Sequence, residues 1–395
     1  MSMDFSELAL GRRDLTRLAT AAVATAGAVA VAARTNATPG TDERHRLRRH
    51  PDGVDALDLP LAAVPGVARR AGGVRTPVIE TDRFTALGVT WQRGEGRVHA
   101  RWRRETGGWT EWRRLPRLTH GPDRGSPEAV GTRAATDLVW TGPSDAVQLE
   151  LDGDQSDPML ALLRPRRRPT DRVVGRHAST RTDEVSARRE GVVPMPGLLY
   201  RRAWGPDPRL RNGRPVYNDR IRQVHVHHTV NSNDYRRADV PGMIRAMYRY
   251  HTRNLGWSDI GYNFLVDRFG RLWEGRAGGP RRAVRGAHTL GFNHASVGVA
   301  AIGNFETKRV GKPMIRALVR VAAWKLDGGN GRPRHTIWIR SDGSDRYPDG
   351  RLVELPTIDG HRDTNETACP GRHLYRALPM VRRRTARRMR EFHAG

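Results

Sequence analysis

Three histidines fall within one short stretch, VHVHHTV, residues 224–230. The surrounding apolar residues predict a buried β-strand, in which an imidazole ring must find a polar partner or a metal ion. Because successive side chains of a strand point to opposite faces, His225 and His227 share one face and His228 lies on the other. This periodicity excludes a single metal ion bound by all three rings, but it does not choose between the two faces.

A second group of candidate ligands lies in DGHRDTNETACPG, residues 359–371. His361 and Cys369, the only cysteine of the chain, stand in a polar segment that has no apolar run to bury. Together with one histidine of the first stretch they would form a His₂Cys site, which leaves the fourth tetrahedral position of zinc open to water, as in catalytic sites. The spacing is no zinc-finger pattern, so an inert buried thiol beside a turn histidine is the competing interpretation.

Length and charge limit the number of domains and the kinds of binding partner that this chain can have. The chain has 395 residues, more than one ordinary domain holds, and a formal net charge of +27 from basic residues that are nearly all arginine. A field of that sign favours polyanionic surroundings, namely nucleic acid, anionic lipid or an anionic cell wall. Codon usage in a GC-rich genome is the simpler explanation for any single surface arginine.

Residues 1–33 have the layout of an export signal. Arg12 and Arg13 precede an uncharged, alanine-rich run over residues 18–33. The paired arginines and the weak hydrophobicity favour the twin-arginine route, although the residues after the pair match its usual pattern only in part. An uncleaved anchor is the alternative, but the run is short for spanning a bilayer. We therefore predict a secreted or cell-wall-associated protein with no stable membrane span after processing.

Composition divides the next part of the chain. Residues 34–75 and residues 164–193 are polar, contain Pro, Gly and Arg, lack sustained periodicity, and are predicted to be linkers. Between them, residues 76–163 contain short alternating segments separated by Gly-rich turns, which predict a small all-β, sandwich-like domain. Its tryptophans could form a carbohydrate-stacking surface, although filling the core is their commoner role. They are Trp91, Trp102, Trp109, Trp112 and Trp140. No motif there carries chemistry, so the role of this domain is open.

Residues 194–395 alternate strand and helix signals and predict an α/β domain with a mixed central sheet flanked by helices. The apolar spacing predicts strands at 221–230 and 296–305, helices at 238–254, 312–327 and 378–392, and a hairpin that turns at 268–270. The two candidate ligand stretches belong to this domain.

Five blocks of this second half occur in the order of a known family: RRAWGPD, VHVHHTV, GWSDIGYNFLVDRFGRLWEGR, GAHTLGFNHASVGVAAIGNF and GHRDTNETACPGRHLY. Over residues 196–390 the chain resembles the peptidoglycan recognition proteins and their relatives, the zinc-dependent N-acetylmuramoyl-L-alanine amidases (type 2 amidases). An export signal, a β-rich domain and a carboxy-terminal amidase-like domain together look like secreted actinobacterial members. The resemblance implies hydrolysis of the amide bond between N-acetylmuramic acid and L-alanine in peptidoglycan, for cell-wall remodelling or lysis.

The resemblance also implies residue roles. His227, His361 and Cys369 match the ligands of one Zn²⁺ per chain, Tyr262 and Thr367 match the other two catalytic positions, and His288 and Asn293 would line the substrate groove. Zinc held by two neutral imidazoles and one thiolate keeps a positive charge, so it can lower the pKa of its water and polarise an amide carbonyl. Many relatives read GRGW after the hairpin, where this chain has EGRAGGPRRAVRGAH. The added Arg281, Arg282 and Arg285 alter a groove wall and leave the preferred stem peptide open.

Two rival functions remain. A peptidoglycan-binding recognition module that does not cut is the first, but such members usually lack a zinc ligand, often the cysteine, whereas this chain keeps all three and Tyr262. A nucleic-acid-binding protein is the second, but the export signal and the scattered arginines argue against it. The predicted partners are therefore peptidoglycan and anionic wall polymers, without nucleic acid. The sequence does not indicate the oligomeric state or whether the wall is the cell's own.

Overall fold

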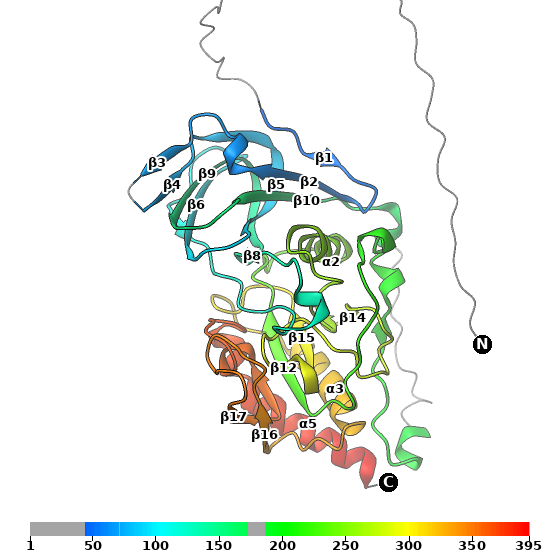
Figure 1. The fold of residues 1–395 in the computed structure, drawn as a ribbon. Coiled ribbons are helices and arrows are strands. Elements are labelled where there is room, and N and C mark those ends of the chain that lie inside the picture. Colours follow the sequence, from blue (N-terminus) through cyan, green and yellow to red (C-terminus); the bar gives the residue numbers. More distant parts are fainter. Residues whose placement is uncertain (1–43, 71, 173–185, 395) are drawn as a thin grey trace, which may run out of the picture. The chain divides into compact units, whose positions relative to one another are not determined.

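The computed structural model describes residues 44–70, 72–172 and 186–394, all of which belong to one compact unit (Figure 1). The predicted export signal, residues 1–33, lies outside these described residues, as does the start of the first predicted linker. Within the described ranges, no helix is long and apolar enough to cross a membrane.

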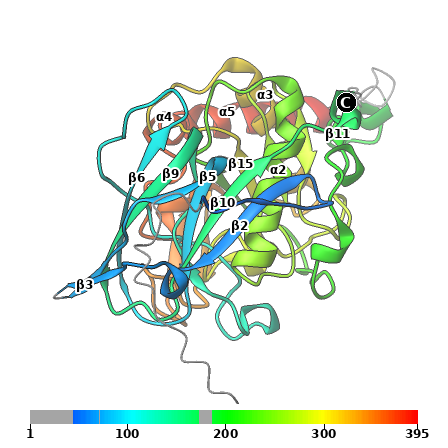
Figure 2. The same ribbon diagram turned by 90° about the horizontal axis from the view of Figure 1, so that it is seen from above.

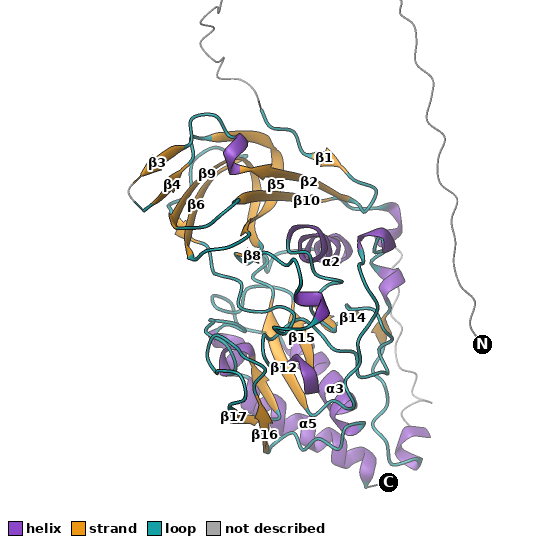
Figure 3. Cartoon of the chain, in the orientation of Figure 1, coloured by secondary structure: helices purple, strands orange, loops and turns teal. Residues whose placement is uncertain are grey.

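The first region is all-β and its strands form one antiparallel sheet. These strands are β1 (Arg48–Arg49), β2 (Val54–Pro60), β3 (Ala68–Arg70), β4 (Gly73–Arg75), β5 (Ile79–Trp91), β6 (Gly96–Arg104), β7 (Arg113–Arg114), β8 (Ala134–Ala135), β9 (Val139–Gly153) and β10 (Met159–Pro165). Neighbours follow the order β1-β2-β10-β5-β9-β4-β3, while β6 joins β9 to β7 and β8 pairs with β5. Figure 3 shows that this region is mostly strand and loop, whereas the long helices belong to the second region.

Alternation along the strands explains the core of the β region. Val98, Ala100 and Trp102 of β6 are each at most 2% exposed, as the period-two pattern predicts for one face of a strand. Trp91 and Trp102 fill this core. Trp109 and Trp112 are half-buried, and the Arg101 guanidinium lies over both rings, 5.0 and 5.1 Å from their centroids.

The second region has a six-stranded mixed sheet in the order β11-β14-β13-β15-β12-β18. Its strands are β11 (Leu198–Leu199), β12 (Gln223–His228), β13 (Phe264–Val266), β14 (Leu272–Glu274), β15 (Ser296–Ala301) and β18 (Ile358–Gly360). β12 is parallel to both of its neighbours, and β13 and β14 form the antiparallel hairpin that the sequence predicts. A separate hairpin of β16 (Thr336–Arg340) and β17 (Leu352–Pro356) was not predicted from the sequence.

Helices cover both faces of this sheet. From residue 240 onward the helices are α2 (Val240–Arg249), α3 (Lys312–Asp327), α4 (Arg372–Tyr375) and α5 (Leu378–His393), and a π-helical turn, Tyr250–Asn254, continues α2. Apolar residues of α3 and α5 pack with one face of the strands, and those of α2 pack with the other. These elements confirm the predicted helices, including the end of α3 at Gly328, and the predicted buried strand β15.

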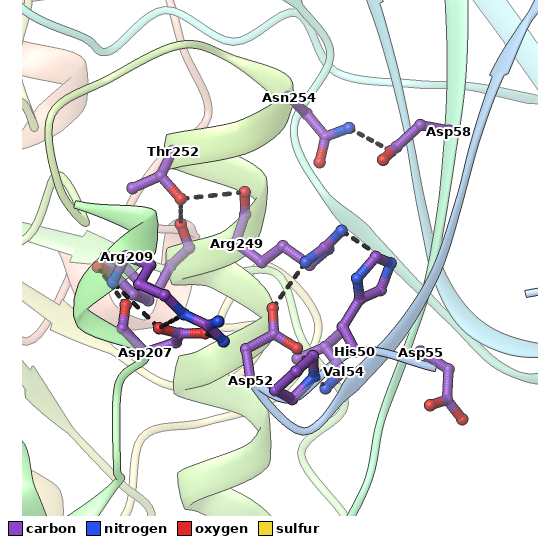
Figure 4. A network of polar contacts seen from close by, with 12 residues as sticks. His50, Asp52, Val54, Asp55, Asp58, Asp207, Arg209, Arg249, Thr252 and Asn254 are labelled. Atoms are coloured by element: carbon purple, nitrogen blue, oxygen red, sulfur yellow. Dashed lines mark hydrogen bonds and ion pairs between the residues drawn. The ribbon is translucent and has the colours of Figure 1, made fainter. Parts of the chain in front are cut away.

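The β region packs against α2. Figure 2 shows α2 beside β2 and β10, and a shared apolar cluster joins these strands to Ala246, Tyr250 and Trp257. A polar network borders it (Figure 4). The Arg249 guanidinium lies 2.7 Å from the Asp52 carboxylate, and the Asn254 amide donates to Asp58 at 2.5 Å.

The predicted linkers need correction. Residues 34–75 contain β1 to β4, and Val54 and Ala56 of β2 are buried, because β2 pairs with β10 along its whole length. The second predicted linker, 164–193, also contributes to the fold, since Ala187 and Val193 pack into the core beneath α3 and α5. Its residues 173–185 lie outside the described ranges.

Candidate metal centre

Strand β12, which lies between β15 and β18, carries three histidines. Val224 and Val226 pack with α3 and α5, so His225 and His227 face the opposite side, where α2 lies. His228 points back toward α3 and α5, and its Nδ1 accepts a hydrogen bond from the backbone N–H of Phe305 at 3.3 Å. The predicted division of the three rings between two faces is confirmed.

The second stretch reaches His227 through β18. In the parallel register Val226 of β12 lies opposite Gly360, the last residue of β18, so His361 follows directly beside His227. The loop then returns, and Arg362 N–H donates to the Cys369 carbonyl at 2.9 Å, which closes the segment into a turn. A Cβ at position 360 would lie 2.7 Å from the Pro370 ring, so glycine is what permits this close return.

The structure brings His227, His361 and Cys369 together. One donor atom from each residue lies within 4.8 Å of the other two, and His227 Nδ1 is 3.8 Å from Cys369 Sγ. A tetrahedral zinc ion with ordinary Zn–N and Zn–S bonds separates two such donors by about 3.6 Å. His361 Nε2 is buried and has no hydrogen-bond partner among the described residues. Two imidazoles and a thiol at this spacing fit a zinc ion, as the residue types predict.

Burial sets the protonation states of these groups. It lowers the pKa of His227 and of His361 well below the ordinary value, so both rings are neutral at pH 7. Burial raises the pKa of the Cys369 thiol. The His228 backbone N–H donates a hydrogen bond to Sγ at 3.3 Å, which lowers that pKa by a smaller amount. Neutral imidazoles are ready ligands, whereas the thiol must lose its proton before it can bind a metal ion.

Two further buried groups hold the strand histidines. His227 Nε2 lies 3.2 Å from His288 Nδ1, and His225 Nδ1 lies 2.6 Å from an Asp359 carboxylate oxygen. Burial raises the pKa of Asp359 to about 6. If Nδ1 of His227 is the ligand atom, its Nε2 carries the proton. That N–H then donates a hydrogen bond to Nδ1 of His288, which fixes the tautomer of the His227 ring. His288 is fully buried behind His227, an arrangement suited to orienting a ligand.

Tyr262 and Thr367 line the same small cavity as His361 and Cys369. Burial raises the pKa of the Tyr262 hydroxyl well above its ordinary value, so it keeps its proton. Its oxygen lies 3.3 Å from Nε2 of His120, a residue of the β region. The Thr367 hydroxyl accepts a hydrogen bond from the Cys369 N–H at 3.2 Å, which helps to position the candidate ligand.

Asn293 is fully buried and joins two parts of the chain. Its Oδ1 accepts hydrogen bonds from the N–H groups of His288 and Thr289, while its Nδ2 donates to the Gly121 carbonyl and to the Asp123 carboxylate. It therefore supports the loop that carries His288 and also contacts the β region.

Arg282 and Arg285, two of the arginines predicted to alter a groove wall, do not line the cavity beside the candidate ligands. The Arg282 guanidinium stacks on the Tyr217 ring at 3.5 Å, and Arg285 donates to the Asn218 side chain at 2.8 Å. Arg285 borders a cavity of about 290 Å³ that is separate from the metal cluster. A larger cavity, of about 580 Å³, lies beyond the end of α3 against α5 and contains none of the candidate ligands.

Sequence reasoning missed two residues of the site. Asp359 is the first residue of the predicted ligand stretch, and the need of a buried His225 for a polar partner was a usable signal. His120 gave no signal, because it lies in a loop of the β region far from the second region in sequence. His251 is buried near His120 and accepts a hydrogen bond from the Gly261 N–H at 3.0 Å.

Two family models match the chain. Residues 217–372 match the model described as N-acetylmuramoyl-L-alanine amidase, and residues 29–173 match the one described as Rv3811 N-terminal galactose-binding domain-like. The first match contains all three candidate ligands, His227, His361 and Cys369. The second covers the β region, including strands β1 to β4 in the range predicted to be a linker.

Individual proteins are also similar. Peptidoglycan-recognition protein 1 of Holotrichia diomphalia is 33% identical over 195 residues, which are 49% of this chain and 85% of that protein. Peptidoglycan-recognition protein SC2 of Drosophila simulans is 28% identical over 153 residues, 39% of this chain and 70% of that protein. Among solved structures, wild-type Drosophila PGRP-LB is 26% identical with a TM-score of 0.36, over 46% of this chain and 91% of that one.

Proposed function

Because the chain belongs to the family of the peptidoglycan-recognition proteins and N-acetylmuramoyl-L-alanine amidases, we propose that it is an enzyme of that family. The proposed reaction is zinc-dependent hydrolysis of the amide bond between N-acetylmuramic acid and L-alanine in peptidoglycan. The observation that carries the proposal is the buried cluster of His227, His361 and Cys369, whose donor atoms lie within 4.8 Å of one another.

In this proposal the three clustered residues hold one zinc ion. A zinc ion held there would supply Lewis acidity and lower the pKa of a water molecule. The His228 backbone N–H, which donates to Cys369 Sγ, favours the thiolate over the thiol. In this proposal His227 Nε2 donates a hydrogen bond to His288 Nδ1, which leaves Nδ1 of His227 free to bind the ion.

Tyr262 has a distinct role in the proposal. Its hydroxyl stays protonated because burial raises its pKa, so it can donate a hydrogen bond to the oxyanion that forms when the amide carbonyl is attacked. Thr367, which borders the same cavity, is the second candidate donor. Neither role requires a covalent intermediate.

Digestion of purified peptidoglycan tests the reaction. Zinc-loaded protein should release free stem peptides that begin with L-alanine, identified by mass spectrometry, and Cys369→Ala should release none. The alternative, a recognition module that binds peptidoglycan without cutting it, predicts retained binding and no free peptide from either protein. Equal release by both proteins would exclude the zinc mechanism.

We also propose that the protein acts outside the cell, at the wall. The net charge of +27 attracts anionic wall polymers, and that attraction should weaken as salt is added. Cosedimentation with insoluble walls and binding to duplex DNA, compared over one salt series, separates this proposal from nucleic-acid binding. Tighter binding to DNA than to walls at every salt concentration would contradict it.

A further inference from the structure

The candidate metal site is closed. Its cavity measures about 30 Å³, room for only one or two water molecules, whereas sites for small ligands usually span about 300–1,000 Å³. His227, His361 and Cys369 are 0, 1 and 9% exposed. A glycopeptide cannot reach them in this arrangement.

A loop of the β region closes the site. We call residues 116–138, which connect β7 to β9 and include β8, the occluding segment. Five of its residues line the cavity against the candidate ligands: Leu118, Thr119, His120, Asp137 and Leu138. The β region therefore covers the candidate ligands on this side of the cavity.

His120 makes the most direct contact. Its ring centroid lies 5.7 Å from that of His361 and 5.4 Å from that of Tyr262, and its Nε2 is 3.3 Å from the Tyr262 hydroxyl. Burial lowers the pKa of His120 to about 3, so the ring is neutral. The hydroxyl that the proposed reaction needs for its oxyanion is thus engaged by the occluding segment.

The segment is also bound where a peptide substrate was predicted to lie. Asn293 donates from Nδ2 to the Gly121 carbonyl at 2.9 Å and to the Asp123 carboxylate at 2.7 Å. The Gly291 N–H donates to the same carboxylate at 2.9 Å. A backbone carbonyl and a carboxylate, both of which a peptide substrate also carries, therefore occupy these donors.

Further bonds fix both sides of the segment. Asn365 donates to the Thr119 carbonyl at 3.1 Å, the Tyr250 hydroxyl donates to the Thr136 carbonyl at 2.9 Å, and Glu128 pairs with Arg276. The Asp123 contact is nevertheless incomplete. Burial raises the pKa of its carboxyl, and its Oδ2 has no partner among the described residues. A buried carboxylate left half-satisfied is costly, which suits a contact that must be released.

We propose that the occluding segment is an internal occupant of the substrate groove and holds the metal site in a latent, closed state. Substrate binds only after this segment leaves Asn293, Gly291 and Tyr262. The identity of the substrate rests on the function proposed above, but the closure does not.

Cys369 provides a test that does not depend on activity, because it is the only thiol of the chain. In metal-free, full-length protein its reaction rate with a chromogenic disulfide reagent measures how often the site opens. We expect Asp123→Ala to raise this rate by about tenfold or more, because it removes two hydrogen bonds to a charged group. Arg124→Ala, an exposed change on the same segment, should leave the rate unchanged.

A second variant displaces the occluding segment without changing Asp123, in case other contacts replace the lost hydrogen bonds in Asp123→Ala. A Cβ at Gly121 would lie 3.3 Å from the Trp257 ring, so Gly121→Leu should force the segment out by steric overlap. Near-ultraviolet circular dichroism checks that each variant keeps its fold. Closure is refuted if both variants react at the wild-type rate, or if wild-type Cys369 reacts as fast as it does in the unfolded chain.

Hydrolysis of a soluble muramoyl peptide by zinc-loaded protein completes the test. We expect Asp123→Ala and Gly121→Leu to exceed the wild type by about tenfold or more, in step with thiol exposure. Exposure of Cys369 without hydrolysis in any variant would support closure and overturn the amidase function. A fall in hydrolysis for Asp123→Ala with no change in thiol rate would instead make the segment a working part of the groove and overturn the proposal.

Discussion

Nε2 of His227 lies 3.2 Å from Nδ1 of His288, and both rings are fully buried. Glycine at position 298 of β15 admits the second ring, since a Cβ there would lie 2.2 Å from Cγ of His288. The sheet therefore carries a candidate ligand on β12 and makes room on the neighbouring strand for the residue that orients it.

His288→Ala should weaken zinc binding by about 10- to 100-fold, because partners of a ligating histidine contribute that much to metal affinity. Competition against a chromophoric chelator measures the change. His288→Asn, whose side-chain oxygen can accept the proton of His227 Nε2, should recover part of the affinity. Equal affinity of wild type and His288→Ala would show that the contact does not orient the ligand.

Zinc affinity should rise with pH. Burial raises the pKa of Cys369, so each bound ion must displace a thiol proton, and the apparent affinity should increase up to about tenfold per pH unit while the thiol is protonated. The lowered pKa values of His227 and His361 add no further protons near neutrality. Titrations between about pH 6 and pH 8 measure this slope. Cys369→Asp, with an ionised carboxylate, is the control expected to flatten it, and a flat wild-type profile would contradict the thiolate assignment.

His227→Ala and His228→Ala should separate the two faces of β12. His227→Ala should lose bound zinc, whereas His228→Ala should keep it but lose about 1–3 kcal/mol of unfolding free energy, because the Phe305 N–H is left without its acceptor. Metal content and urea unfolding measure the two effects. Loss of zinc in His228→Ala, with His227→Ala unaffected, would reverse the assignment.

The elements of the second region could be predicted because their signals are local. The apolar periodicity of α3 and α5, the hairpin turn at 268–270 and the unbroken apolar run of β15 each lie within a few residues. The region 34–75 was misassigned for the opposite reason. β2 is stabilised by β10, about a hundred residues later, and no local pattern among its Pro, Gly and Asp neighbours reveals that pairing.

The candidate site shows the same limit. Strand alternation alone separated His228 from the other two histidines, but the choice of His227 needed the family resemblance. Neither strand alternation nor the family resemblance predicted the contact between His120 and Tyr262, because it depends on how the β region packs across α2. Long-range packing of one region on another leaves no periodic trace in either sequence.

Tyr262→Phe should lower kcat by about 10²- to 10³-fold and leave KM and zinc content nearly unchanged, because the hydroxyl acts only on the developing oxyanion. The measurement should be made in an Asp123→Ala background, in which the site is expected to be open already. Loss of the contact between Tyr262 and His120 then does not change access to the site. Tyr235→Phe is a matched control: its buried hydroxyl donates to the Ile302 carbonyl at 3.0 Å, and its loss should cost stability but not kcat. Equal kcat for Tyr262→Phe and its parent would remove Tyr262 from the mechanism.

Two arginines near α2 make ion pairs of nearly equal length but different burial (Figure 4). Arg249 lies 2.7 Å from the Asp52 carboxylate with side chains 7 and 3% exposed, while Arg209 lies 2.8 Å from Asp207 with its own side chain 70% exposed. Arg249→Met should destabilise the protein by about 3–5 kcal/mol, because it leaves the Asp52 charge buried without its partner. Arg209→Met should cost less than about 1 kcal/mol, because water solvates the exposed Arg209 guanidinium.

Denaturant unfolding measures the loss of unfolding free energy in each variant. It thereby shows whether burial or the length of the ion pair sets the contribution of each pair. A double variant, Asp52→Asn with Arg249→Met, should recover part of the loss, since it removes the stranded charge as well. Similar losses for Arg249→Met and Arg209→Met would mean that burial does not set how much each pair contributes to stability.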